Sequence, residues 1–144
     1  MRRYVSSLET LKNPNADQPQ VVATAYDLTG NTTYRSAALE GLDYVLGRNA
    51  IAQVYVRGYG TKDTQNVHSR LYAHELSDTV PQAPAGAMAG GANQAASDPP
   101  ADDVLQGCAP QTCYVDDVNS YSTNEVAINW NSALAWVVGW AANQ

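Results

Sequence analysis

The sequence of 144 residues contains no phenylalanine, and it has only eight basic residues against 14 acidic ones, which gives a net charge of −6. Nucleic-acid binding requires a clustered positive surface, but the basic residues here are scattered apart from Arg2 and Arg3. We therefore expect no nucleic-acid partner. The aromatic residues are nine Tyr and three Trp. Such rings have a polar edge, which suits half-buried packing and wet, sugar-like ligands alike.

Long apolar segments are also missing from the sequence. No run approaches the length of a membrane span, and the basic start of the chain, residues 1–13, is not followed by the apolar region of a signal peptide. The sequence therefore predicts no membrane insertion. It also lacks a phosphate-binding glycine fingerprint, the Cys/His pattern of a closed zinc site and a serine elbow.

Cysteine is scarce, with only Cys108 and Cys113 in the turn-rich stretch GCAPQTCY. The two residues could form a small disulfide, which would imply export of the protein. Two free thiols or half of a metal site fit the same spacing, so the sequence alone leaves these alternatives open.

Helical patterns lie toward the two ends of the chain. Residues 1–16 are predicted to be the end of a helix that runs into a loop, with Pro14 as the breaker. A second helix is expected from Asp17 to Thr29, and a third begins at Asn31 or Thr32 and ends before Gly47. The apolar stripe of the third helix consists of Tyr34, Ala38, Leu42, Val45 and Leu46.

A final helix is expected from about Thr123 to Ala142. Its predicted buried stripe has i+4 spacing and consists of Val126, Trp130, Leu134 and Val138, widened by Ala127, Ala133 and Val137. Between the helical ends, residues 51–60 are short and β-branched and could be extended. Residues 61–120 hold five prolines and the Gly/Ala-rich stretch PAGAMAGGANQAAS. A connection of that length is unusual unless it is functional. The sequence predicts an all-α chain with few helices and a long loop region.

Glu125 stands at the start of the last apolar run and allows two interpretations. Ser122 and Glu125 fit a capping box, in which Glu125 folds back onto the backbone of Ser122 and the helix N-terminus favours its ionised form. A general acid instead needs burial or a nearby negative charge to stay protonated. Such surroundings could come from three aromatic residues and two acidic ones, namely Tyr121, Trp130, Trp136, Asp116 and Asp117.

The residues around Glu125 match a longer pattern. Tyr114-Val-Asp116, four residues, Tyr121, three residues, Glu125, then Ala127 and Asn131-Ser132 resembles the second signature of glycoside hydrolase family 9. An earlier stretch resembles the other signature of that family, which ends in His-x-Arg: Val54-Tyr-Val56, Gly60-Thr-Lys62 and Val67-His68-Ser69-Arg70. Arg57 departs from this signature, which usually has Ser, Thr or Val at that position. The resemblance covers the chain from about Tyr26 to Ala142.

The resemblance implies an (α/α)6 barrel whose open cleft binds β-1,4-glucans, chiefly cellulose. It also implies an inverting mechanism, in which a carboxylic acid protonates the leaving oxygen while a carboxylate on the other face of the sugar activates water. Transferred by motif position, the catalytic set is Glu125 as general acid, Asp116 as a support for Glu125 and its loop, and His68. Arg70 shares with His68 the positioning of sugar hydroxyls, and Tyr121 and Tyr59 are expected to stack on sugar rings.

One family feature has no counterpart in this chain. The family's water-activating base lies in an Asp-Ala-Gly-Asp stretch, whereas the acidic pairs here, Asp102-Asp103 and Asp116-Asp117, lie in the wrong part of the sequence. A twelve-helix barrel also cannot be built from 144 residues. We therefore expect residues 1–144 to be a single partial domain, the C-terminal third of such a catalytic domain, from an extracellular parent protein whose signal peptide lies outside this chain.

Two other functions remain open at this point. The chain could be a non-catalytic, carbohydrate-binding or partner-dependent fragment, or a plain helical fragment in which Glu125 only caps a helix. The chemistry requires no cofactor, although three acidic residues of the loop could bind a structural calcium ion: Asp98, Asp102 and Asp103. On its own, a chain with uncovered apolar helix faces is expected to self-associate.

Overall fold

A computed structural model describes residues 17–95 and 97–144, so the helix end predicted within residues 1–16 lies outside the described residues. The helices are α2 (Asp17–Thr29), α3 (Thr32–Val45), the 3-10 helix η1 (His74–Leu76), α4 (Pro99–Val104), α5 (Tyr121–Asn124) and α6 (Ile128–Ala141). Between these helices, the described backbone pairs only through isolated β-bridges. The prediction of an all-α chain with few helices and a long loop region is confirmed.

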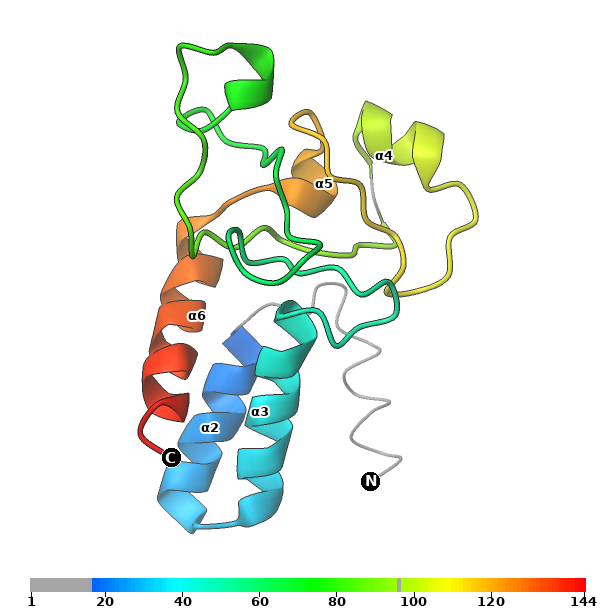
Figure 1. Ribbon diagram of the computed structural model, residues 1–144. Coiled ribbons are helices and arrows are strands. Elements are labelled where there is room, and N and C mark those ends of the chain that lie inside the picture. Colours follow the sequence, from blue (N-terminus) through cyan, green and yellow to red (C-terminus); the bar gives the residue numbers. More distant parts are fainter. Residues whose placement is uncertain (1–16, 96) are drawn as a thin grey trace.

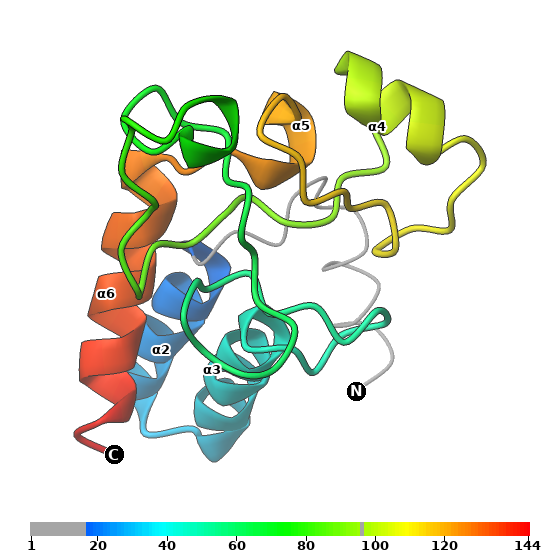
Figure 2. The ribbon, with the colours of Figure 1, turned by 45° about the horizontal axis from the view of Figure 1, so that its top comes forward.

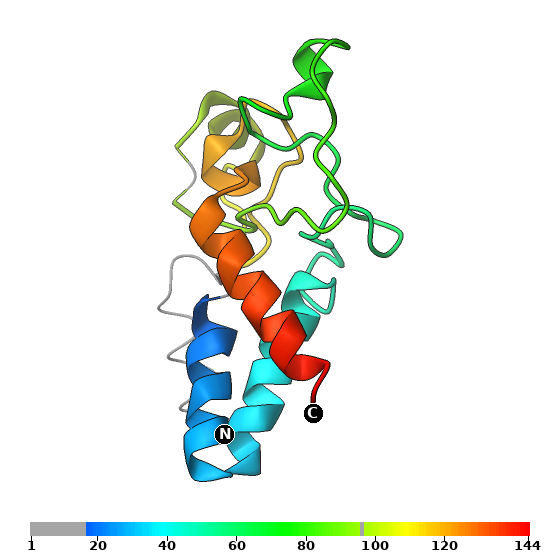
Figure 3. The same ribbon diagram turned by 90° about the vertical axis from the view of Figure 1, so that its left-hand side faces the viewer.

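The three long helices pack side by side and form the helical half of the molecule (Figures 1 and 3). Asn31 caps α3 because its side chain accepts a hydrogen bond of 3.0 Å from the Thr33 N–H. Gly30 precedes it at φ +67°, in the left-handed region that glycine adopts without strain. The α2–α3 turn therefore has the predicted position.

Close packing of α2 on α3 depends on small residues. A Cβ atom at Gly41 would lie 2.5 Å from Cγ of Pro19, so only glycine allows this approach. Ala23 and Ala38 are fully buried and form a cluster with Trp140 of α6. The Trp140 Nε1–H donates to Asp27 at 2.9 Å, which satisfies the polar edge of the buried ring. None of the helices in the described part of the chain is long and apolar enough to cross a bilayer.

The predicted start of the last helix at Thr123 is wrong. The structure has the short α5, then an extended stretch at residues 125–127, and α6 begins only at Ile128. The extended stretch bonds sideways to other loop segments: Gly90 N–H donates to the Glu125 carbonyl at 2.9 Å, and Val126 N–H donates to the His68 carbonyl at 3.2 Å. These lateral bonds replace the i to i−4 bonds that a continuous helix would require.

The predicted stripe of α6 is only partly correct. Leu134 is buried, but Val138 is 47% exposed, and the buried residues of α6 are Ala133, Leu134, Val137 and Trp140. A helix turns about 100° per residue, so positions spaced by four drift around the axis by about 40° per step. A strict i+4 stripe therefore leaves the buried face within a few steps.

Residues 46–95 and 97–127 form a loop platform on top of the helical half (Figures 1 and 2). Residues 54–56 are extended, as predicted, and bridge to Asp63 on one side and Met88 on the other. A core cluster joins the platform to α3 and α6: Val45, Val54, Tyr55, Val56, Met88, Ala133 and Leu134. Cys108 and Cys113 form a disulfide, which settles the alternatives that the sequence left open.

Candidate active site

Glu125 and His68 are neighbours on the loop platform. They form a parallel β-bridge, in which His68 N–H donates to the Asn124 carbonyl at 2.9 Å. Directly paired residues of adjacent strands lie about 4.8 Å apart and project their side chains to the same face. The bridge therefore directs the side chains of the exposed Glu125 and of His68 to the same face, although the two residues are far apart in the sequence.

The capping-box interpretation of Glu125 is wrong. Glu125 has extended backbone angles, φ −69° and ψ 140°, and follows α5 as its C-cap residue. The N-cap residue of α6 is Ala127, which makes no side-chain cap bond, and the Ser122 hydroxyl donates to Asp98 instead. The Glu125 carboxyl is thus not tied to a helix end and is open to a ligand.

His68 is held in one orientation by the loop that follows Asp116. Its Nδ1 lies 2.7 Å from the Val118 carbonyl oxygen. A carbonyl can only accept a hydrogen bond, so Nδ1 carries the proton and Nε2 remains for a ligand. The Tyr121 ring lies edge-on to the imidazole, with 6.1 Å between the ring centroids, and it is 48% exposed. The structure therefore brings His68, Glu125 and Tyr121 together.

Asp116 lies beneath this group and supports the backbone. Its carboxylate accepts hydrogen bonds from four protein donors: Gln65 N at 2.8 Å, Asn66 N at 2.9 Å, Asn124 Nδ2 at 2.9 Å and Thr64 Oγ1 at 3.1 Å. Asn124 directly precedes Glu125, and Asn66 lies two residues before His68. Asp116 thus joins the two segments that carry the site, and its oxygens are directed to protein donors.

Asn124 and Thr64 are site-supporting residues that the sequence did not reveal. Both are fully buried, and Asn124 Nδ2 also donates to the Asn66 carbonyl at 2.6 Å. The Tyr114 hydroxyl donates to Asn124 Oδ1 at 2.6 Å. Burial, followed by the charge of Asp116, raises the pKa of Tyr114, so the hydroxyl stays a donor. In the sequence, Asn124 before an apolar run is typical of a helix cap and Thr64 is an ordinary loop residue, so neither pattern indicated this role.

Asn131 of the second signature holds a third segment in place. Its Oδ1 accepts from Met88 N–H at 2.8 Å, and its Nδ2 donates to the Met88 carbonyl at 3.0 Å. The amide thus pairs with the backbone as a neighbouring strand would. Two residues after Met88, a Cβ at Gly90 would lie 2.8 Å from the Trp130 ring, so glycine is required where residues 88–91 pass over α6.

Arg70 and Tyr59 are less closely tied to the site. Arg70 is exposed two residues after His68. Tyr59 is 54% exposed in a separate turn, which is closed by a 2.6 Å hydrogen bond from Gly58 N–H to Asp63. Within the described part of the chain, no ring contact or hydrogen bond joins Tyr59 to His68 or Glu125.

Arg57, which departs from the family signature, cross-links the loops. Its Nε donates to the Ala83 carbonyl at 2.5 Å, Nη1 donates to Gln65 at 3.0 Å, and Nη2 donates to Gln82. The guanidinium presents several donors in a fixed plane, which suits it to join three segments at once. The departure therefore has a structural explanation.

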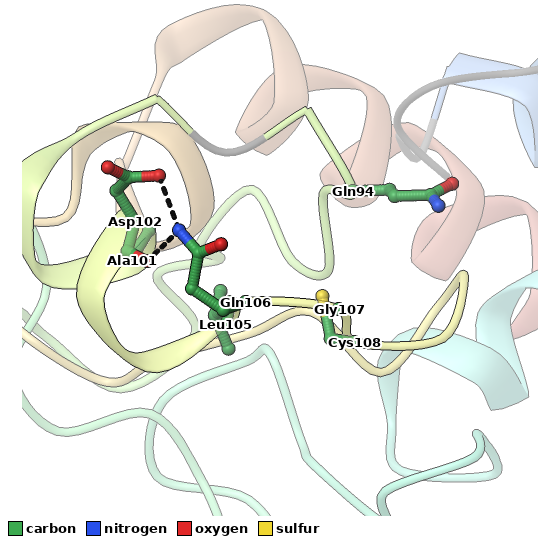
Figure 4. Close-up of a pocket in the computed structure, with 7 residues that line it drawn as sticks. All are labelled: Gln94, Ala101, Asp102, Leu105, Gln106, Gly107 and Cys108. Carbon is green, nitrogen blue, oxygen red and sulfur yellow. Dashed lines mark hydrogen bonds between the residues drawn. The ribbon is translucent and has the colours of Figure 1, made fainter.

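The acidic residues near α4 do not assemble into a metal site. Asp98 is buried and caps α4 by accepting from Ala101 N–H at 2.9 Å, while Asp102 accepts from Gln106 at 3.0 Å. No group of three or more His, Cys, Asp or Glu side chains suited to a metal occurs among the described residues. A hollow of about 150 Å³ lies here (Figure 4), lined by Asp102 but by none of the residues expected to act in catalysis or sugar binding.

Comparisons with known proteins show what this chain is similar to. Residues 4–138 match the model of Glycosyl hydrolase family 9. Over 127 residues the chain is 52% identical to Endoglucanase C of Cellulomonas fimi, covering 86% of this chain and 12% of that protein. It is 42% identical over 125 residues to a cellulose 1,4-beta-cellobiosidase of Acetivibrio thermocellus, covering 86% of this chain and 14% of the relative.

Solved structures show the same fold. AaCel9A in complex with a cellobiose-like isofagomine superposes with a TM-score of 0.76 at 28% identity, over 91% of this chain and 26% of that one. A Bacteroides ovatus GH9 protein gives a TM-score of 0.68 at 38% identity, over 85% of this chain and 20% of the other. These structures are (α/α)6 barrels, and this chain spans only a small part of its relatives' length. The chain belongs to glycosyl hydrolase family 9.

Proposed function

We propose that this chain forms the acid-bearing part of a catalytic domain that hydrolyses β-1,4-glucosidic bonds in cellulose or related β-glucans by inversion. The observation that carries the proposal is the His68–Glu125 bridge, which aligns an exposed carboxyl, an imidazole with a free Nε2 and a half-exposed tyrosine ring on one surface. The names of the relatives, an endoglucanase and a cellobiosidase, support a β-1,4-linked glucan as substrate.

Each residue has a distinct part in this proposal. Glu125 protonates the leaving glycosidic oxygen. His68 Nε2 and the Arg70 guanidinium bind sugar hydroxyls and hold the scissile bond in line, while Tyr121 stacks on a sugar ring. Asp116 acts through Asn124 and Asn66, because it fixes the backbone from which Glu125 and His68 project.

Inversion also needs a base that activates water, with the two carboxyl groups about 6.5–9.5 Å apart. No stretch of this sequence matches the family's Asp-Ala-Gly-Asp pattern, and the Asp116 oxygens are occupied by protein donors. We therefore propose that the base comes from residues outside this chain. The Cys108–Cys113 disulfide supports an extracellular location.

A chimera tests the proposal. The aligned segment of this chain replaces its counterpart in Endoglucanase C, which supplies the remaining helices, and reducing-sugar release from cellulose is measured. Glu125→Gln should lower the rate by about 10²–10⁴ without lowering the melting temperature, because the side chain is exposed. Glu40→Gln, on the exposed face of α3, is the matched control and should leave the rate unchanged.

The stereochemistry of the product provides a second measurement. Inversion of a β-linkage releases the α-anomer first, which proton NMR detects before mutarotation. Release of the β-anomer would refute the inverting mechanism. If the chimera and its Glu125→Gln variant bind cello-oligosaccharides equally, and neither hydrolyses them faster than the other, this segment is a carbohydrate-binding module.

A further inference from the structure

Asp98 is a fully buried carboxylate and is not among the residues to which a catalytic or sugar-binding role is given above. Its Oδ1 accepts from Ala101 N–H, while its Oδ2 accepts from Ser122 N–H at 2.7 Å, from Ser120 Oγ at 3.1 Å and from the Ser122 hydroxyl. A buried charge is tolerated only with such a set of partners. Burial alone would raise the pKa of Asp98, but the hydrogen bonds from Ser122, Ala101 and Ser120 outweigh it and lower the pKa.

The donors to Asp98 surround one residue of the candidate active site. Ser120 and Ser122 are the neighbours of Tyr121 on both sides, and the Tyr121 hydroxyl itself donates to the Ser97 carbonyl at 3.1 Å. Asp98 therefore holds both sequence neighbours of Tyr121, and Ser97 holds the Tyr121 hydroxyl. In Figure 2, α5 lies beside α4, whose first turn Asp98 caps.

Burial does not fix the Tyr121 ring, because the ring is 48% exposed. On the side of the site, the ring approaches the His68 imidazole edge-on, with 6.1 Å between the ring centroids. An exposed aromatic side chain with one ring neighbour has freedom to rotate unless its backbone and hydroxyl are held. The bonds to residues 97 and 98 supply that restraint.

We propose that Asp98 is a positioning residue that fixes Tyr121 edge-on against His68, so that the ring presents its face to a sugar unit bound beside Glu125. The sugar contact rests on the function proposed above, whereas the ring geometry does not. Asp98, which caps α4, thereby affects the affinity for substrate through Tyr121. Its own oxygens accept hydrogen bonds from Ser120, Ser122 and Ala101 and do not face the platform surface.

The ring geometry is tested in the 144-residue chain without sugar. With 13C-labelled Tyr and His, nuclear Overhauser effects between the Tyr121 ring and the His68 imidazole report the edge-on contact. Asp98→Asn should weaken them at least about threefold, since the amide cannot accept the same donors. Ser122→Ala removes only the hydroxyl bond to Asp98, keeps the carboxylate and should weaken the Overhauser effects less. Asp102→Asn, on the exposed side of α4, is the control and should leave them intact.

The sugar contact is tested by a double-mutant cycle in the chimera, with cellotetraose as the probe. Asp98→Asn should weaken binding about fivefold when Tyr121 is present and have no effect in a Tyr121→Ala background, because coupled residues are not additive. Turnover at saturation should change little, since Glu125 and His68 are untouched.

Unchanged Overhauser effects in both Asp98→Asn and Ser122→Ala would overturn the inference. An equal loss of affinity in the Tyr121→Ala background would also overturn it, because Asp98 would then act on the fold in general. If the unmutated chimera fails to bind cellotetraose, the function proposed above fails, while the Overhauser effects still decide the ring geometry.

Discussion

The helical half and the loop platform are stabilised by different interactions. The interior of the helical half is apolar and consists of small residues packed under one tryptophan: Ala23, Ala38 and Trp140. The platform buries polar side chains beside its apolar cluster, and its fully buried polar residues are Thr64, Asp98, Ser120, Thr123 and Asn124. Burying such groups costs free energy unless each finds a partner, and each of these five residues has one, whereas the buried Tyr55 hydroxyl has none among the described residues.

The difference follows from the backbone. Helices satisfy their own N–H and C=O groups, so their side chains are free to pack by shape. An irregular platform has no such ladder, and its buried peptide groups are satisfied by side chains such as Asn131 on Met88 and Asp116 on residues 65 and 66. In the platform the same bonds provide stability and place Glu125 and His68, whereas in the helical half stability is separable from the site.

The largest expected effect concerns the 144-residue chain on its own. It lacks a match to the family's base, so an acid without a partner should hydrolyse carboxymethyl-cellulose too slowly to measure. Its helical half exposes large apolar side chains, among them Val21 at 69% and Leu28 at 82%, so we expect self-association in size-exclusion chromatography.

Replacing Val21 and Leu28 by Lys, on one face of α2, should shift the chain toward the monomer. A wild-type monomer that hydrolyses the polymer well would contradict both expectations and would make one of four aspartates the base: Asp102, Asp103, Asp116 or Asp117.

The next largest effect is expected for Asn124→Ala in the platform. The substitution removes one hydrogen bond each from Asp116, Tyr114 and the Asn66 carbonyl within a buried polar network, so the free energy of unfolding should fall by about 2–4 kcal/mol. Urea denaturation of the chain in the Val21→Lys/Leu28→Lys background measures this. In the chimera, activity per folded molecule should fall as well, because the segment before Glu125 loses its anchor. A stability loss with normal activity would show that the two properties are separable in the platform too.

Val137→Ala is the matching change in the helical half. Val137 is 1% exposed, and removing two methyl groups from a packed interior should cost about 1–3 kcal/mol. Activity of the chimera per folded molecule should not change, since Val137 lies outside the cluster that joins α6 to the platform. If Val137→Ala alters the rate per folded molecule, the separation between the two halves does not hold.

The sequence predicted the helical half better than the platform, because helices form by local bonds whereas the platform depends on partners far away in the sequence. The α2–α3 turn follows from local chemistry, because Gly30 and Asn31 specify a helix end and a helix start within two residues. The break at residues 125–127 depends on partners far away in the sequence, Gly90 and His68. Local patterns carry no information on such partners, so the sequence extended the last helix too far.

The candidate site residues came from the two family signatures and not from hydrophobic periodicity. The spacing of the two family signatures selected five candidate residues: His68, Arg70, Asp116, Tyr121 and Glu125. In the structure, His68, Tyr121 and Glu125 lie together. Their supports, Thr64 and Asn124, resemble ordinary loop and cap residues in sequence. Only their burial and their contacts across 50 or more positions distinguish them.

A smaller effect on stability is expected for His68→Ala. The side chain is half-buried and makes one bond within the platform, from Nδ1 to the Val118 carbonyl, so the free energy of unfolding should change by about 1 kcal/mol or less. The chimera should nevertheless lose activity on glucan, because Nε2 no longer holds a sugar hydroxyl. A large loss of stability with normal activity per folded molecule would mark His68 as a structural residue.

The smallest effect is expected in the pH dependence of stability, and it arises from Asp98. Burial opposes its charged form, but hydrogen bonds from Ser122, Ala101 and Ser120 outweigh burial and lower its pKa in the folded chain, so the unfolded chain binds the proton first as the pH falls. The contribution is complete above the unfolded pKa of about 3.9 and is lost as the pH drops through the folded value. Urea unfolding between about pH 6 and pH 3 should therefore show a shallower fall for Asp98→Asn than for the unmutated chain. Identical slopes would mean that Asp98 does not hold its donors as a carboxylate, and the contrast between an apolar half and a charged, polar platform would lose its clearest example.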